Sequence, residues 1–369
     1  MTARGRRRRR VRAAVRAVFA AGCLCACGEA PVVAGAPSEG LVFVRVVDGS
    51  TEVMRARLAD GAVRPLTQTA DREESWPYWS QGAGLLVFQT RAPDAGAPTD
   101  LVLWDSRTGK ERPLAATPTR DERWPGWSPD GRRLAYAFRG GRPTAGVAIA
   151  NPATGDARIV AESGARDFFL RPNFDPVGER LVAQRRGPDG RGSHLWILTG
   201  SAPAQPLTRD PAWFDMKAWF TRDASRVIYA RRPVAGGPHD IVSVAPDGSD
   251  LRIHASDPRA DDHSAGPSPA RDEFAFVSDR AGSFDVFVAD LEGDRMRRVT
   301  RTPDVHEFAP RWSPDGERLV VIATDTSVGQ PRLDEPESLA STRVRVLDRD
   351  GRVLFEAPGY NPDWMPPWP

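Results

Sequence analysis

The segment Pro125-Gly126-Trp127-Ser128-Pro129-Asp130-Gly131 decides the fold, because related segments recur along the whole chain. An aromatic residue stands at positions 79, 127, 174, 220, 312 and 364 and a proline at 267, so the intervals are 48, 47, 46, 47, 45 and 52 residues. Short β-branched and aromatic runs, such as 134–137 and 147–151, follow these positions and are separated by turns rich in Asp, Gly and Pro. Short strands at regular spacing predict an all-β radial repeat.

The two ends of the repeat region indicate how the ring closes. Residues 41–46, 52–58 and 64–69 supply three strands of a blade that lacks its first strand, and the last repeat around Trp364 has no strands after it. We therefore predict a seven-bladed β-propeller of four-stranded blades over residues 40–369, with the first blade closed by a C-terminal strand. The alternative is six blades with one end of the chain outside the ring.

Most of the repeated residues have a structural explanation. We expect the aromatic residues of the repeat to pack between neighbouring blades; they are Trp79, Trp127, Phe174, Phe220, Trp312 and Trp364. Asp130 and Asp315 lie in Ser-Pro-Asp-Gly segments, which favour a turn over a catalytic carboxylate.

The first 26 residues differ from the rest of the chain. The run 6–10 is all arginine, and a short apolar stretch at 17–26 follows it, which is typical of a signal for export. A nucleic-acid-binding patch is the alternative interpretation of the arginines. The leader holds eight Arg and no acid, so the overall charge of +2 becomes −6 once it is removed. We therefore expect no nucleic-acid partner for the mature domain, which we expect to be a monomer.

The three cysteines all lie at the end of this leader. The run Leu24-Cys25-Ala26-Cys27 resembles the bacterial lipoprotein box, which implies cleavage after 26 and lipidation of Cys27. Residues 27–39 would then be a flexible tether. By the same resemblance, Gly28 favours the periplasmic face of the outer membrane. An ordinary cleaved signal with incidental cysteines is the alternative.

The repeat itself resembles that of the TolB-like propellers. The resemblance rests on Pro-x-Trp-Ser-Pro-Asp-Gly-x-x-Leu, then an aliphatic strand, a strand ending in Asp and a Leu-Thr strand, and it covers nearly all of 41–366. It implies an exported β-propeller that docks partners. Similar repeats also occur in prolyl-oligopeptidase-type peptidases and oligogalacturonate lyases, so fold alone does not fix activity. From the sequence given, we expect no separate N-terminal domain of the kind that TolB itself has.

The residues that precede each innermost strand are our candidates for a site, because they gather at one mouth of a propeller. Acids, aromatics and histidines recur there: Glu73, Glu74, Trp76, Asp121, Glu122, Trp124, Asp167, Trp213, Asp215, Asp261, Asp262, His263, His306 and Glu307. Such a mouth favours a non-catalytic module that binds a protein or peptide partner. The alternative role of the same side chains is to link neighbouring blades.

An enzymatic function is the competing hypothesis. His263 and His306 hold comparable positions in adjacent repeats, and they are the candidates for a divalent metal of a metal-assisted polysaccharide lyase. No third histidine is placed to join them, and no G-x-S-x-G segment occurs in the sequence. We therefore expect neither catalysis nor a cofactor.

Overall fold

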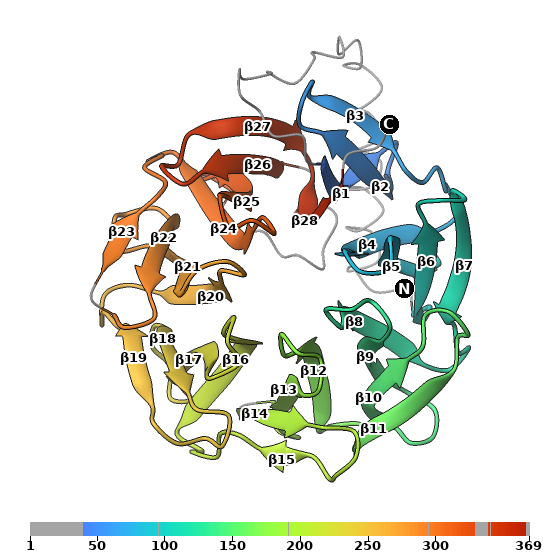
Figure 1. The fold of residues 1–369 in the computed structure, drawn as a ribbon, viewed down its shortest axis with the longest axis horizontal. Helices are drawn as coiled ribbons and strands as arrows, with labels where there is room; N and C mark the ends of the chain where they lie inside the picture. Colours follow the sequence, from blue (N-terminus) through green and yellow to red (C-terminus); the bar gives the residue numbers. More distant parts are fainter. Residues whose placement is uncertain are drawn as a thin grey trace, which may run out of the picture.

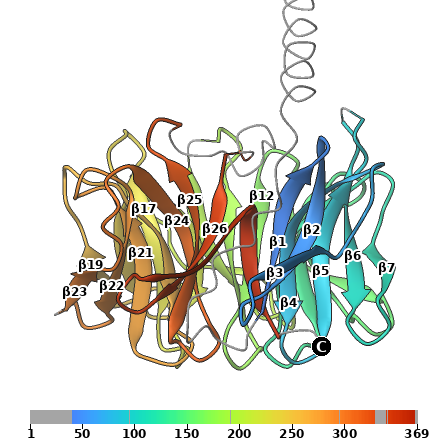
Figure 2. The same ribbon diagram turned by 90° about the horizontal axis from the view of Figure 1, so that it is seen from above.

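The structure is a computed structural model that describes residues 40–94, 96–190, 192–293, 295–328, 339 and 341–366. Its strands stand around a central axis, and the chain passes once around the ring (Figure 1). Seen from the side, the strands run between the two faces of the ring, where the loops gather (Figure 2). This confirms the predicted all-β propeller. The predicted leader (1–26) and tether (27–39), with Cys27, lie outside the described residues.

Twenty strands form five separate four-stranded sheets. The first sheet consists of β28 (Tyr360–Met365), β1 (Gly40–Val47), β2 (Ser50–Arg57) and β3 (Ala62–Pro65). The next two sheets consist of β4 (Glu73–Ser80), β5 (Leu85–Arg91), β6 (Thr99–Asp105) and β7 (Lys110–Ala115), and of β8 (Asp121–Trp127), β9 (Leu134–Arg139), β10 (Ala145–Ala150) and β11 (Ala157–Ser163). The last two consist of β20 (Asp262–Pro267), β21 (Glu273–Ser278), β22 (Asp285–Asp290) and β23 (Met296–Arg298), and of β24 (Val305–Trp312), β25 (Arg318–Asp325), β26 (Arg343–Asp348) and β27 (Val353–Pro358).

The remaining strands share one eight-stranded sheet. It holds β12 (Phe168–Phe174), β13 (Leu181–Arg186), β14 (Ser193–Leu198), β15 (Gln205–Pro206), β16 (Trp213–Phe220), β17 (Val227–Pro233), β18 (Asp240–Val244) and β19 (Arg252–Ala255). The prediction of seven separate four-stranded blades is therefore wrong in its count, because the described part of the chain forms five such separate sheets.

A short outer strand explains the shared sheet. β15 has two residues, and neither its own Pro206 nor Pro203 just before it has an N–H to donate to a longer ladder. β15 and the residues that follow it bond to Leu195, Trp196 and Ile197 of β14, and β16 pairs in parallel with the beginning of β14, at Ser193 and Phe214. Because β15 has only two residues, the beginning of β14 can pair with β16, and this pairing joins the two repeats in one sheet.

The two ends of the chain meet within one sheet. β28 pairs antiparallel with β1, with Leu41 opposite Trp364 and Val42 opposite Asp363. This confirms the predicted closure by a C-terminal strand and contradicts the alternative in which one end lies outside the ring. The Asp363 carboxylate also accepts the backbone N–H of Trp79 at 2.8 Å, so the closing strand is bonded to the next sheet as well. Closure therefore gives β1 a partner on both sides, with β28 as the inner strand of this sheet.

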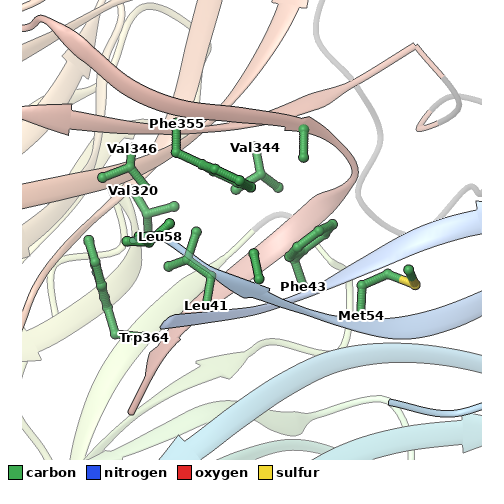
Figure 3. Close-up of a cluster of buried hydrophobic side chains, with 11 residues drawn as sticks. Leu41, Phe43, Met54, Leu58, Val320, Val344, Val346, Phe355 and Trp364 are labelled. Carbon is green, nitrogen blue, oxygen red and sulfur yellow. The ribbon is translucent and has the colours of Figure 1, made fainter. Parts of the chain in front are cut away.

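The hydrophobic core is divided among the interfaces between sheets. Figure 3 shows the cluster where the first and last sheets meet: Leu41 and Phe43 of β1 face Val344 and Val346 of β26 and Phe355 of β27. All of these side chains are at most 2% exposed. Burial of each contributes roughly 1.5–3 kcal/mol to folding, so this cluster holds the closed ring together.

The repeated aromatic residues lie in these interfaces, as predicted. Trp79, Phe220, Trp312 and Trp364 are buried, and Trp127 and Phe174 are partly buried against neighbouring clusters. The indoles also bond across the interface. Trp127 Nε1 donates to the Tyr78 carbonyl at 3.0 Å, Trp312 Nε1 to that of Gly266 at 3.1 Å and Trp364 Nε1 to that of Arg311 at 3.2 Å. Each indole therefore fixes the position of two successive inner strands.

The Ser-Pro-Asp-Gly segments form tight turns, as predicted for Asp130 and Asp315. Ser128 Oγ donates to the Asp130 carboxylate at 2.6 Å, and Ser313 Oγ to that of Asp315 at 2.5 Å. Gly131 has φ of 70°, and a Cβ there would lie 2.6 Å from the backbone N of Ala83. Both acids are thus occupied in the turns. No helix among the described residues is long and apolar enough to cross a membrane.

Candidate functional site

Each inner strand carries one residue in the left-handed backbone region. These residues, called bulge residues below, lie three positions before the repeated aromatic or its Pro substitute: Trp76 (φ 52°), Trp124 (53°), Arg171 (49°), Lys217 (54°), Ser264 (58°), Ala309 (51°) and Asn361 (48°). In β4, β8, β12, β16, β20 and β24 the pairing register with the next strand shifts at this point. A bulge of this kind redirects a side chain, and a non-glycine residue there costs about 1–3 kcal/mol.

The bulge residues and their neighbours make contacts across the ring axis. The Arg171 guanidinium lies over the Trp76 indole, with Cζ 4.9 Å from the ring centroid, although β8 stands between β12 and β4 (Figure 1). Arg311 of β24 likewise reaches β4 past β28: its Nη2 donates to the Tyr78 hydroxyl at 2.8 Å. Side chains of strands that are not neighbours can meet only by pointing inward. These residues therefore lie toward the axis.

Lys217 and Ser264 form a polar link between the adjacent strands β16 and β20. Lys217 Nζ donates to Ser264 Oγ at 2.9 Å, and His263 Nδ1 lies 2.9 Å from the same oxygen. Burial and then the charge of Arg171 lower the pKa of Lys217 to about 8. Burial, and next the charge of Lys217, lower the pKa of His263 to about 3. The imidazole is therefore neutral at pH 7, and the lysine carries most of its positive charge.

Five of the predicted mouth acids are buried within the fold. They are Glu74, Glu122, Asp215, Asp262 and Glu307, each at most 2% exposed. Glu74 accepts the N–H of Val53 at 3.0 Å and pairs with Arg72 at 2.8 Å, and Asp262 pairs with Arg280 at 2.8 Å. Glu74 is thus bonded to the preceding sheet through Val53, as in the alternative role considered from the sequence, whereas Asp262 is paired within its own repeat.

Threonines of the preceding outer segment explain the position of these acids. Thr208 Oγ1 donates to the Asp215 carboxylate at 2.6 Å and accepts the N–H of Leu195 at 3.0 Å. Thr302 Oγ1 donates to Glu307 at 2.6 Å. A buried carboxylate needs such partners. Burial still raises the pKa of Glu122 and of Glu307 to about 7 each.

The other predicted acids are partly exposed and paired within the protein. Glu73 pairs with Arg91 at 2.5 Å, Asp121 with Arg123 at 3.1 Å and Asp167 with Arg185 at 2.5 Å. Asp261 is bonded to His239 at 2.6 Å. Burial opposes ionisation of Asp261, but the bonds from His239 lower its pKa to about 2. Each of these four carboxylates therefore has a cation or an imidazole of the same chain beside it.

The three predicted aromatics remain partly accessible. Trp76 is covered on one face by Arg171, and Trp213 lies under Arg231, whose Cζ is 4.1 Å from the ring centroid. The backbone N–H of Trp124 donates to Gln89 Oε1 at 2.7 Å, while its indole makes no hydrogen bond to a described residue. Trp213 also lines a pocket of about 340 Å³ with Asp215, Tyr229 and Arg231. The aromatics and the partly exposed acids are thus the part of the predicted mouth that a ligand can reach.

The two histidines proposed as metal ligands both contact the Phe284 ring. Its centroid is 5.3 Å from that of His263 and 5.4 Å from that of His306. His306 Nδ1 accepts the backbone N–H of Phe284 at 3.0 Å. Among the described residues, no group of three or more His, Cys, Asp or Glu side chains is placed to hold a metal ion.

Sequence reasoning missed the residues nearest the axis: Arg171, Lys217, Ser264 and Arg311. A signal was available in the repeat, since the position three before each repeated aromatic or its Pro substitute is always a bulge residue. In the first four repeats this position holds two tryptophans and then two cations, Trp76, Trp124, Arg171 and Lys217. The sequence analysis instead selected the acids that lie two to four positions earlier.

Comparison with known proteins gives the same fold. The sequence profile of the TolB beta propeller domain matches residues 123–357, which is more than half of the chain. The chain belongs to the TolB β-propeller domain family. Among solved structures, a TolB of Agrobacterium tumefaciens is 20% identical with a TM-score of 0.51, over 70% of this chain and 88% of that one.

Propeller enzymes are also similar in fold. An oligogalacturonate lyase in complex with manganese is 14% identical with a TM-score of 0.61, over 77% of this chain and 82% of that one. A prolyl endopeptidase is 12% identical with a TM-score of 0.65, over 89% of this chain. The match covers 50% of the endopeptidase, so this chain spans about half the length of that protein. At these identities the likeness shows the fold alone.

Proposed function

We propose that this TolB-family propeller is a non-catalytic module that binds a protein or peptide partner at the end of the ring where the inner strands begin. The observation that carries the proposal is the accessibility of Trp76, Trp124 and Trp213, in a fold that buries most of its repeated aromatics. Accessible tryptophans beside charged groups are the usual anchors of protein interfaces. The charged groups here are the paired, partly exposed acids Glu73 and Asp121.

The propeller would act at a membrane surface in the periplasm, with lipidated Cys27 as its anchor and residues 27–39 as its tether. The support for this membrane anchor is the amino-acid sequence of the leader. Incorporation of labelled fatty acid into the chain, and its loss in Cys27→Ser, would support it. Release of the unchanged chain into the soluble fraction would contradict it.

Capture from a detergent-solubilised envelope tests the docking surface. The purified chain should retain a defined partner, and Trp76→Ala with Trp124→Ala should reduce that retention about tenfold, because each anchor contributes about 1 kcal/mol or more. Ile253→Ala is a matched control on outer strand β19, where Ile253 is 57% exposed. Equal retention by the double variant and the control would exclude this end of the ring as the docking surface.

A metal-assisted lyase is the competing function, and a metal analysis separates the two. The manganese-bound lyase of similar fold is the observation that keeps it under consideration. Stoichiometric manganese or zinc in the purified chain, lost on replacement of His263 and His306 by alanine, would contradict the non-catalytic proposal. Its absence after purification with added metal would leave partner binding as the function to test.

A further inference from the structure

Arg171 and Lys217 stand apart from the other cations of the inner strands. They are bulge residues of the adjacent strands β12 and β16, and both are partly accessible. Among the described residues, neither makes an ion pair with a carboxylate. By contrast, Arg123 pairs with Asp121 and Arg311 with Asp363. The ring therefore holds two positive charges near its axis without carboxylate partners.

The surroundings do not compensate these charges. Burial lowers the pKa of Arg171, Tyr78 raises it and the charge of Arg311 lowers it again. No carboxylate contributes to the shift. The acid that acts on Lys217 is Asp261, whose carboxylate already accepts the backbone N–H of His239 at 2.8 Å and contacts its ring at 2.6 Å. Partly desolvated like charges without a counter-charge are unfavourable, so an added anion gains energy there.

Hydrogen-bond donors remain available on both side chains. Arg171 uses the face of its guanidinium on Trp76, and its N–H groups donate to no described residue. None of its nitrogens is a buried atom without a partner, so water reaches them. Lys217 has three N–H groups and one bond, to Ser264. We propose that Arg171 and Lys217 form a binding site at the ring axis for a carboxylate or phosphate group.

The chemistry of the two donors fits an oxyanion. A guanidinium presents N–H groups in a fork that matches two oxygens, and an ammonium adds a further charge-assisted bond. The site does not depend on the proposed protein partner, since a free anion can occupy it. A peptide that carries a terminal carboxylate or an acidic side chain could also supply the group, so the two sources need separate measurements.

Titration of the purified full chain in detergent tests this site. Sodium phosphate and sodium acetate are added at constant ionic strength, balanced with sodium chloride, and binding is followed by calorimetry and tryptophan fluorescence. We expect saturable binding of at least one of the two anions that weakens about tenfold in Arg171→Gln and in Lys217→Met, as for loss of one charge-assisted bond. Lys110→Met, an exposed lysine of outer strand β7, should bind as the unchanged chain does.

The outcomes are distinct. Absence of saturable binding of either anion at constant ionic strength, or equal weakening in Lys110→Met, would overturn the proposal as a nonspecific charge effect. Correct folding of the variants is checked by their circular dichroism, and Lys217→Met keeps side-chain length if Arg171→Gln fails to fold. A short peptide with a free C-terminus, compared with its amidated form, shows whether a peptide carboxylate can be the source. Failure of envelope capture would leave this result unaffected.

Discussion

The guanidinium of Arg171 covers the indole of Trp76 across the ring axis, with Cζ 4.9 Å from the ring centroid. The contact joins β12 to β4, two inner strands that are not neighbours (Figure 1). It depends on left-handed backbone at both residues, with φ of 49° and 52°. Cation–π contacts of partly buried groups contribute about 0.5–2 kcal/mol, which offsets part of this strain.

The unpaired charge of Lys217 should make stability depend on pH in the alkaline range. Its pKa of about 8 in the folded protein lies below the ordinary 10.5. Below pH 8 the buried ammonium therefore lowers the free energy of unfolding by its full amount. Between pH 8 and 10.5 the free energy of unfolding should rise, because the folded protein loses the proton while the unfolded chain still holds it. Lys217→Met should be more stable than the unchanged chain at pH 7, by about 1–2 kcal/mol because solvent still reaches the group.

Urea unfolding at pH 7 and pH 9.5 measures this difference. The advantage of Lys217→Met should shrink at the higher pH. A variant that is less stable at pH 7 would mean that the bond to Ser264 outweighs the desolvation of the ammonium.

Glu122 should produce the opposite dependence in the acidic range. Burial raises its pKa to about 7 from 4.5, so the folded protein holds the proton more tightly than the unfolded chain. The contribution of this group to stability is therefore complete below pH 4.5 and is lost as pH rises to 7. Glu122→Gln should gain about 1–2 kcal/mol at pH 7.5 and nothing at pH 4.5.

Thermal or urea unfolding of the two chains at both pH values checks this. Glu292→Gln is the control, because that side chain is 75% exposed. A gain of the same size at both pH values would show that ionisation of Glu122 is not its cause.

Trp364 should be essential for ring closure. It is 4% exposed, packs in the cluster of the first and last sheets and donates to the Arg311 carbonyl. Trp364→Ala should lower the free energy of unfolding by about 3–5 kcal/mol, as expected for a buried aromatic. Trp219→Ala, at a side chain that is 36% exposed, should cost clearly less. Similar costs in denaturant titrations would show that the closing strand is not critical.

Much of the fold could be predicted from the sequence because the repeat is a matter of local chemistry. Turn residues such as Asp130 and Gly131 mark strand ends, and Trp364 without following strands indicates closure. The joining of β14 to β16 could not be predicted in this way. It depends on how few bonds Gln205–Pro206 can make, which becomes visible only when the neighbouring strand is placed beside it.

The candidate site was harder to predict for a similar reason. Glu74 and Asp215 have the position of mouth residues in the sequence, but Thr67 and Thr208, which follow the preceding outer strands β3 and β15, bind their carboxylates inside the fold. The left-handed conformation of Arg171 has no signal such as glycine, since the sheet imposes it through a bulge. Long-range partners are not encoded in composition or spacing, and the bulge position, although regularly spaced, is not marked by any one residue type.

Site-specific photocrosslinking in intact cells tests the central claim, partner docking at the inner-strand end of the ring, most directly. A photoreactive phenylalanine analogue is placed at Trp124 and, as the matched control, at Ile253 on the outer surface. We predict a defined crosslinked species from position 124, identified by mass spectrometry, that is absent from position 253. Crosslinks from position 253 alone, or from neither position, would contradict the account.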